Sequence, residues 1–399
     1  MPANGLPPLY VIRRTFPRPC LPDPAGALRV QLDRHRALIR PGANIAIAVG
    51  SRGIARLREL VAVTASRVTD QGGRPFVVPA MGSHGGATAE GQAQILADYG
   101  IREDSVGAPI RSSMEVVELE RSGCEVRIYQ DRHAYESDGI IVINRVKPHT
   151  DFHGRHESGL IKMIVIGLGK RHQAVEIHRH GVRGLREIVP EVATRVLAQS
   201  KIILGVGIVE NGYEEIADIR AVPATEIPSR DVEMLDEARS LMPGLPVEDL
   251  DVLIVDKMGK DISGVGMDPN VIGRLGIRGE PDPERPRIKV IVARDLTPAS
   301  HGNALGIGLA DIVTRRLYEK IDFGPMYENL YTSSFLERGK IPVIAESDEQ
   351  ALSFALRACP GLEPSRLRAI RIQSTLRLDV LHVSKPIVDE LQGRPDIEV

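Results

Sequence analysis

Short apolar runs rich in β-branched residues alternate with longer amphipathic stretches along this chain. Residues 44–50 (Asn-Ile-Ala-Ile-Ala-Val-Gly) have the composition of a buried strand, and apolar residues then recur at helical spacing over 53–68. Aromatic residues make up only 4% of the sequence, so the core must rest on Ile, Val, Leu and Ala. Such a core suits parallel strands covered by helices. We therefore expect an α/β fold.

The alternation occurs in two parts, separated by Pro243-Gly-Leu-Pro246, which has the composition of a linker. We expect two α/β domains, one over residues 1–245 and one over 246–399, with the active site in the cleft between them. In the first domain the pattern predicts further strands at 75–79, 138–144 and 201–209, and helices at 88–99, with Thr88 as N-cap, and at 184–199. In the second domain it predicts strands at 250–255, 288–293, 369–373 and 376–383, and a helix over 305–321.

Charge and composition limit the classes of partner. The 51 basic and 53 acidic residues nearly cancel, whereas nucleic-acid and membrane-surface binders need a surplus of positive charge. No apolar run reaches the roughly 18–20 residues that a membrane-spanning helix needs. The proline-rich first 24 residues are unlike a signal peptide, and three cysteines are too few for a disulfide framework. We expect a cytoplasmic protein that binds neither nucleic acid nor membranes; the sequence leaves its oligomeric state open.

Histidines are concentrated in one segment. Six of the eleven lie within 32 residues, where an even distribution would place about one: His149, His153, His156, His172, His178 and His180. A solvated loop is one interpretation, and a proton-transfer or metal site is another, because imidazole titrates near neutral pH and binds metals. The spacings within the cluster resemble those of zinc ligands, but no His-Glu-x-x-His and no Cys pair completes a tetrahedral site.

Two other features point to a ligand site. The loop Gly82-Ser-His84-Gly-Gly86 lies between a predicted strand and a predicted helix, where glycines let a ligand approach and the helix N-terminus favours an anion. It matches neither a Walker loop nor a dinucleotide fingerprint, and a plain turn is the alternative. Lys162 stands in the apolar stretch Gly159-Leu-Ile-Lys-Met-Ile-Val-Ile-Gly167, so it either extends to the surface or is partly desolvated and functional.

The order of these residues resembles the nickel-dependent lactate racemase family. The likeness is carried by His84 in its Gly/Ser loop, Lys-Pro-His149 after a strand, Lys162 after a Ser-Gly step, and His178 sixteen residues later. In that family a pyridinium-derived nucleotide holds nickel through sulfur groups as a pincer and is joined covalently to a lysine. One histidine completes the nickel coordination, and two others exchange protons with the substrate hydroxyl.

Position by position, the resemblance implies roles for individual residues. His84 and His149 would be the acid/base pair, Lys162 the tether of the nickel-pincer nucleotide, and His178 the nickel ligand. The segment with Ser51 and Arg52 occupies the place where the family contacts the nucleotide. His153 and His156 lie in a loop longer than in lactate racemase proper. The lactate-binding residues of the C-terminal domain are not recognisable here, so the candidates for the substrate carboxylate are Arg52, Lys147 and Lys260 with the donor cluster Ser300, His301 and Asn303.

The resemblance implies a racemase or epimerase of lactate or a larger 2-hydroxy acid. Removing the C2 proton would create a second negative charge beside the carboxylate, whereas removing a hydride while a base takes the hydroxyl proton gives a neutral keto group. A hydride route needs a cofactor as electron sink and one base for each enantiomer, for which imidazole is suited. The alternatives are a non-catalytic nucleotide- or anion-binding protein on the same fold, and a conventional NAD oxidoreductase, against which the missing glycine fingerprint counts.

Overall fold

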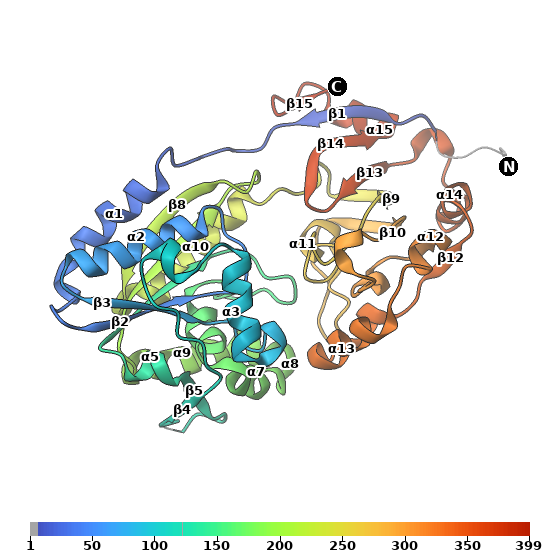
Figure 1. Cartoon of the computed structure of the whole chain (residues 1–399). Helices are drawn as coiled ribbons and strands as arrows, with labels where there is room; N and C mark the ends of the chain where they lie inside the picture. The colour runs from blue at the N-terminus through green and yellow to red at the C-terminus, as the bar shows by residue number, and fades with distance from the viewer. Residues whose placement is uncertain (1–6, 122) are drawn as a thin grey trace. The chain divides into compact units, whose positions relative to one another are not determined.

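The computed structural model describes residues 7–121 and 123–399, which form two compact units (Figure 1). One unit is Pro17–Met242, and the other combines the described residues up to Phe16 with Pro243–Val399. Each unit contains a β-sheet with helices, so the predicted α/β class is confirmed.

The first unit is built on a five-stranded sheet in the order β3-β2-β6-β7-β8. Four strands are parallel, namely β2 (Asn44–Val49), β3 (Arg74–Pro79), β6 (Gly139–Arg145) and β7 (Ile202–Glu210), and β8 (Ile216–Pro223) is antiparallel to β7. The chain passes from β2 to β3 on one side and to β6 on the other. Ligands of open α/β sheets bind where strand order reverses in this way, beyond the carboxyl ends of the strands.

Helices cover both faces of this sheet. On one face, Leu28 and Leu60 pack in a common core with Ile47 of β2 and Ile141 of β6. On the other face, β7 has glycines where two helices approach closely; a Cβ on Gly205 would lie 2.9 Å from Leu160. The main helical elements of the unit are α1 (Pro24–Arg34), α2 (Leu57–Asp70), α3 (Ala89–Asp98), α4 (Glu103–Val106), α5 (Arg132–Glu136), α6 (Leu160–Lys162), α7 (Lys170–His178), α8 (Gly181–Arg183), α9 (Val189–Gln199) and α10 (Ile227–Leu241), with π-helical turns at Met163–Gly167 and Gly184–Ile188 and a hairpin of β4 (Val116–Leu119) and β5 (Ile128–Asp131).

The strands predicted in this unit are confirmed to within one or two residues at their ends. The Thr88 N-cap is also confirmed, because its side chain accepts a hydrogen bond of 3.0 Å from the Gly91 N–H. Helix α3 ends just before Gly100, which has a φ of +74° that favours glycine.

The second unit contains an eight-stranded sheet in the order β12-β11-β10-β9-β13-β14-β1-β15. Five neighbouring strands are parallel: β9 (Asp249–Val255), β10 (Arg287–Ala293), β11 (Ile312–Thr314), β12 (Val343–Ala345) and β13 (Ala369–Ser374). The other three strands each pair antiparallel with the strand before them in the sheet order: β14 (Arg377–Val383) with β13, β1 (Tyr10–Arg14) with β14, and β15 (Ile397–Glu398) with β1. The helices of this unit are α11 (Pro269–Ile272), α12 (Arg315–Tyr318), α13 (Phe323–Ser333), α14 (Asp348–Arg357) and α15 (Lys385–Leu391).

The N-terminal segment differs from the predicted domain boundaries. Strand β1 pairs with β14 on one side and β15 on the other, so the first described strand belongs to the second unit's sheet, and the chain then enters the first unit. Ile12 is fully buried there, and this burial fixes the strand.

The predicted helix over 305–321 is wrong. Gly306 has a φ of +93° and passes so close to the Val265 carbonyl oxygen that a Cβ would lie 1.8 Å from it. Ile312 and Val313 then form part of β11, paired with β10 and β12, before α12 begins. Their apolar spacing suits a helix, but pairing within the sheet buries them better.

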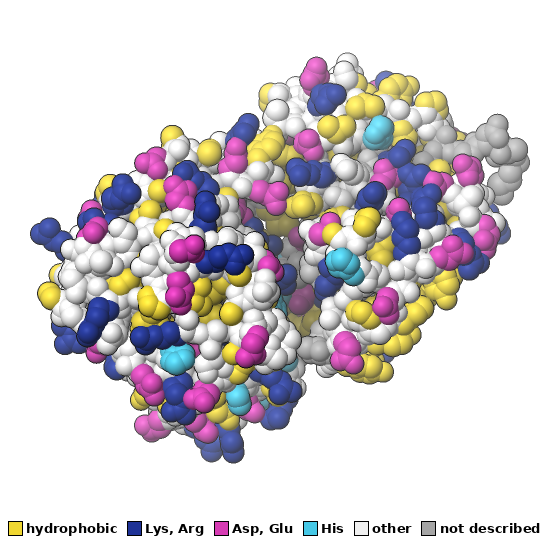
Figure 2. Space-filling model, in the orientation of Figure 1, with side chains coloured by type: hydrophobic (Ala, Val, Ile, Leu, Met, Phe, Trp, Pro, Cys, Tyr) yellow, Lys and Arg dark blue, Asp and Glu magenta, His cyan; other side chains and the backbone are white. Residues whose placement is uncertain are grey.

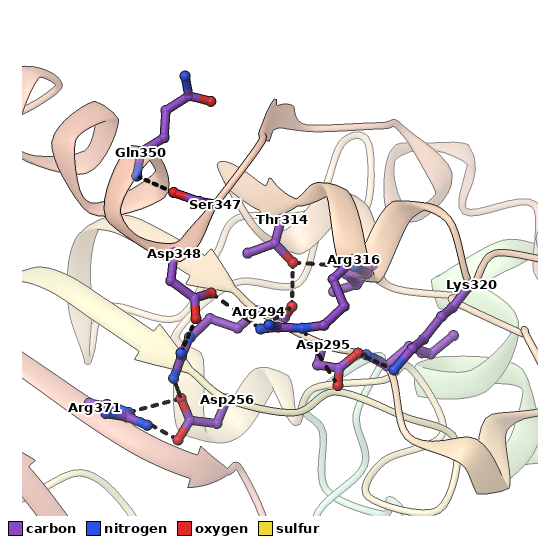
Figure 3. Close-up of polar contacts among 12 residues, drawn as sticks. Asp256, Arg294, Asp295, Thr314, Arg316, Lys320, Ser347, Asp348, Gln350 and Arg371 are labelled. Atoms are coloured by element: carbon purple, nitrogen blue, oxygen red, sulfur yellow. Dashed lines mark hydrogen bonds and ion pairs between the residues drawn. The ribbon is translucent and has the colours of Figure 1, made fainter.

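A charged network in the second unit joins the residues directly after β9 and β10 to the middle of β13 and to the start of α14 (Figure 3). Asp256, directly after β9, accepts from Arg294 Nη1 at 2.6 Å and from Arg371 Nε at 2.9 Å. Arg294 also pairs with Asp348 at the start of α14. The guanidinium of Arg294, with a smaller effect of Arg316, lowers the pKa of Asp348 below its usual range, although burial opposes this shift. The network therefore fixes the loops after β9 and β10 against α14.

Charges of both signs are interspersed on the face shown in Figure 2, in keeping with the net charge of −2. Within residues 7–121 and 123–399, the structure has no helix that combines the length and apolar character needed to cross a bilayer.

Candidate functional site

Four of the predicted site residues of the first unit come from loops at one edge of its sheet, whereas Lys162 and His178 are on helices α6 and α7. Ser51 and Arg52 follow β2, His84 follows β3, and His149 follows β6. Since these strands are parallel, their carboxyl ends lie at the same edge, where the strand order reverses. The topology thus brings together segments that are nearly a hundred residues apart in sequence.

The loops after β2 and β3 are joined by a direct contact. Ser51 Oγ is hydrogen-bonded to His84 Nδ1. Gln92 fixes the backbone of the His84 loop, because its Nε2 donates to the carbonyl oxygens of Gly82 and His84 at 3.0 and 3.2 Å. Gln92 in turn accepts from the ammonium of Lys170 at 3.1 Å. The position of the His84 ring is therefore set by a buried polar network.

Lys170 is a fully buried cation at the start of α7. Its ammonium donates to the Pro79 carbonyl oxygen at 2.5 Å and lies 3.1 Å from a carboxylate oxygen of Asp131, which is also fully buried. Burial lowers the pKa of Lys170, and the Asp131 carboxylate opposes this shift. The pair links the ends of β3 and β5 to the helix that carries His178.

His149 and Lys162 are in direct contact through His149 Nε2 and Lys162 Nζ. The other ring nitrogen, Nδ1, accepts from the Asp151 N–H at 3.0 Å, and the ring packs on Phe152 with centroids 4.7 Å apart. A neutral imidazole that accepts at Nδ1 carries its proton on Nε2. We therefore assign Nε2–H as the donor and the neutral amine of Lys162 as the acceptor.

The surroundings of Lys162 make the neutral amine more accessible than in an ordinary lysine. The side chain is half-buried, and burial, together with the charges of Arg52 and Lys147, lowers its pKa to about 8 against the opposing effect of Asp151 and Glu157. An amine with a pKa near 8 is a better nucleophile at neutral pH than an ordinary lysine. Of the two interpretations that the sequence left open, partial desolvation is the one seen here.

His178 is the last residue of α7, and His180 follows in the turn after it. Burial is the first cause that lowers the pKa of His178, and the charge of Lys162 is the second, which places the two side chains in one electrostatic environment. The residue keeps an exposed surface while its ring is partly desolvated, and the lowered pKa favours the uncharged imidazole that a metal ligand requires.

His153 and His156 contact carboxylates. His156 Nδ1 lies 2.9 Å from Asp231 Oδ2 and His153 Nδ1 lies 3.4 Å from Glu157 Oε1. Among the residues that the structure describes, no three His, Cys, Asp or Glu side chains are grouped so that they could hold a metal ion. The zinc-like spacings of the sequence therefore do not correspond to a cluster of protein ligands.

Three functional candidates were missed by sequence reasoning: Glu157, Asp231 and Arg239. Glu157 lies inside the histidine-rich segment and could have been found as the residue four positions after His153. Asp231 and Arg239 are on α10, more than 70 residues further along, and no motif marks them.

In the second unit, three of the four predicted substrate residues lie together. The Ser300 hydroxyl accepts from the Lys260 N–H at 2.9 Å. Lys260 Nζ and Asn303 Nδ2 both donate to Asn329 Oδ1, at 2.9 and 3.2 Å. His301 is exposed beside Ser300, in the left-handed backbone region. Asn329, on α13, was not anticipated from the sequence.

Comparison with solved structures relates this fold to known proteins. It is similar to the lactate racemase apoprotein from Thermoanaerobacterium thermosaccharolyticum, with a TM-score of 0.54 and 11% sequence identity over 92% of this chain and 99% of that one. It is also similar to a crystal structure of a protein from Thermotoga maritima, with a TM-score of 0.50 and 15% identity over 70% and 72% of the two chains. No family model and no curated protein matches the sequence. At these identities the likeness is one of fold, and the chain shares the fold of lactate racemase.

Proposed function

We propose that this protein is a racemase or epimerase of a 2-hydroxy acid. The observation that carries the proposal is the contact between the imidazole of His149 and the half-buried amine of Lys162, with a second imidazole, His84, on a loop at the same sheet edge. The shared fold with lactate racemase supports it. The substrate hydroxyl needs a base for each enantiomer, and the two imidazoles provide them.

The residues present fit a lysine-tethered nickel-pincer nucleotide. The amine of Lys162, with a pKa of about 8, would form the covalent link, and the imidazole of His178, whose pKa is lowered, would bind the nickel. Ser51 and Arg52 would contact the nucleotide. When bound, this group supplies the hydride acceptor that protein side chains lack.

The side chains of His84 and His149 then exchange the proton of the substrate hydroxyl. His84 has Nδ1 engaged by Ser51, so we assign Nε2 to proton exchange with the substrate hydroxyl. In His149 the assigned tautomer carries its proton on Nε2, so this nitrogen acts as a base toward the opposite enantiomer only after the Asp151 N–H releases Nδ1 and the ring proton moves to Nδ1. Once the amine of Lys162 is tied up in a covalent link, its lone pair no longer competes for His149 Nε2.

A hydroxy acid also brings a carboxylate. Arg52 and Lys147 both lower the pKa of Lys162, which places two cationic side chains near its amine. We propose that Arg52 and Lys147 bind the carboxylate and that Lys260, Ser300, His301 and Asn303 remain candidates for the rest of the substrate. The same cations would also suit a non-catalytic anion-binding protein, so the test has to separate binding from turnover.

The test is a panel of single-enantiomer 2-hydroxy acids incubated with protein produced together with the machinery that makes the cofactor. We expect loss of optical purity with at least one acid, nickel in the purified protein, and a modified Lys162 in peptide mass spectrometry. His84→Asn and His149→Asn should lose turnover and keep nickel, whereas His133→Asn, on α5, should behave as wild type. Nickel-loaded protein with an intact Lys162 adduct that racemises none of the acids would favour the binding protein instead.

A further inference from the structure

Two buried carboxylates organise the loop between β6 and α6, which carries His149 and leads to Lys162. The base of the loop is closed by a hydrogen bond of 2.7 Å from the Lys147 N–H to the Ser158 carbonyl oxygen. Inside it, the Glu157 side chain is fully buried and accepts from the His149 N–H at 2.6 Å and from the Gly154 N–H at 3.1 Å. The backbone at His149 is therefore fixed by Glu157.

Glu157 receives its counter-charge from outside the loop. Arg239, on α10, donates to Glu157 Oε1 at 2.7 Å and to the Gly154 carbonyl oxygen at 3.0 Å. Burial raises the pKa of Glu157, but the hydrogen bonds from His153, the His149 N–H and Arg239 outweigh burial and leave the pKa below its usual range. A buried carboxylate that loses such a partner is strongly destabilised.

The second carboxylate, Asp231, comes from the same helix and holds the other end of the loop. Asp231 Oδ1 accepts from the Leu160 N–H at 2.6 Å, at the first residue of α6, and Oδ2 contacts His156. Gly159 is the N-cap residue and has no side chain to cap the helix, so Asp231 takes that role. A Cβ on Gly159 would lie 2.2 Å from Asp231 Oδ1, which explains the glycine.

We propose that helix α10 positions the His149–Lys162 pair, with Arg239 acting on His149 through Glu157 and Asp231 acting on Lys162 through the start of α6. Arg239, Glu157 and Asp231 are therefore positioning residues. The inference deepens the proposed function, since it concerns the same pair, but it does not require that the protein racemise anything. Removing Arg239 should loosen the loop, hydrate Lys162, and return the amine toward an ordinary lysine.

The test measures acetylation of Lys162 by sulfo-N-hydroxysuccinimidyl acetate, as a function of pH, in full-length protein produced without the cofactor. Peptide mass spectrometry gives the rate at Lys162, and the exposed Lys340 is the internal reference. In wild-type protein the rate should rise with a midpoint near pH 8. Arg239→Gln should move the midpoint upward by about one pH unit and reduce the rate at pH 8 about fivefold, and Arg239→Lys should restore part of it.

Arg230→Gln is the matched control. Both arginines are on α10 and each forms an ion pair of 2.8 Å with an acid three residues away in sequence, but of the two only Arg239 also reaches Glu157. Asp231→Ala is the second variant; it removes the acceptor of the Leu160 N–H at the start of α6 as well as that of His156, and it should slow labelling at least twofold. If the variants, folded by circular dichroism, label Lys162 at the wild-type rate and midpoint, the proposal is overturned.

Because labelling is read on protein without cofactor, its outcome is independent of racemisation. A wild-type labelling profile in both variants would remove the positioning role and leave the racemase proposal standing. Slow labelling in Arg239→Gln combined with no racemisation by the loaded wild-type protein would support the positioning role and remove the racemase proposal.

Discussion

His149 Nε2 contacts the amine of Lys162, while Nδ1 of the same ring accepts a hydrogen bond from the Asp151 backbone. This pairing fixes the ring's tautomer and makes the lysine a hydrogen-bond acceptor, which only a neutral amine can be. The relationship between an imidazole and an uncharged amine connects the fold of the first unit to its chemistry.

The stability of the protein should depend on the charge of Lys162. Its pKa is about 8 in the folded protein and should be near its ordinary value of 10.5 in the unfolded chain. Between these values the unfolded state binds more protons, so the free energy of unfolding should rise with pH across this window. Urea denaturation followed by circular dichroism from pH 7.5 to 10.5 should show this rise in wild type and a weaker one in Lys162→Met. Parallel profiles for the two proteins would contradict the assignment.

Gly159 should not tolerate a side chain. Its φ of −168° is available to any residue, so Gly159→Ala tests only the contact of the new methyl group with Asp231. We expect a loss of about 1–3 kcal/mol in the free energy of unfolding, as for an overpacked core. Gly244→Ala, where no atom lies within 4 Å of the added methyl group, is the control and should change stability by less than about 0.5 kcal/mol. Equal effects would mean that Asp231 moves aside freely.

Lys170 should be essential for folding stability. Lys170→Met leaves the fully buried Asp131 without its cation, and breaking a buried pair costs about 3–5 kcal/mol. Lys385→Met breaks an exposed pair with Asp389, for which about 0–1 kcal/mol is expected. Chemical denaturation of both variants measures the difference. A Lys170→Met protein as stable as Lys385→Met would show that the buried network contributes little.

Arg294 should matter more than an arginine at the surface of the same unit. Arg294→Leu leaves two partly buried carboxylates, those of Asp256 and Asp348, without a shared donor (Figure 3). We expect a loss of about 1–3 kcal/mol. Arg315→Leu, which breaks an exposed pair with Glu346, should cost about 0–1 kcal/mol. Thermal unfolding would distinguish the two, and a reversed order would contradict the role given to the network.

The strands were predictable because each buried parallel strand is a local run of β-branched residues, as in β2 and β6. β1 was not, because its partner β14 lies over 360 residues away and its own pattern is short. The expected helix at 305–321 failed for a similar reason, since pairing with β10 overrides the local spacing of apolar residues.

The candidate site also contains residues that local sequence motifs identify and residues that only tertiary packing defines. His84, His149, Lys162 and His178 lie in short local motifs, so the sequence could identify them. The residues that hold them, Asp231 and Arg239 above all, are defined by where α10 packs, and that packing depends on the whole sheet. The pairing of His153 and His156 with carboxylates could not be read from spacing, because the same spacing also suits metal ligands.

The central claim is tested most directly by racemisation in D2O. Nickel-loaded protein with the Lys162 adduct is incubated with one enantiomer of an accepted 2-hydroxy acid, and the inverted product is isolated and its C2 isotope content measured by mass spectrometry. A hydride that leaves and returns does not exchange with solvent, so we predict that the inverted acid retains protium at C2. Inversion with deuterium at C2, or no inversion of any acid by the loaded protein, would contradict the account.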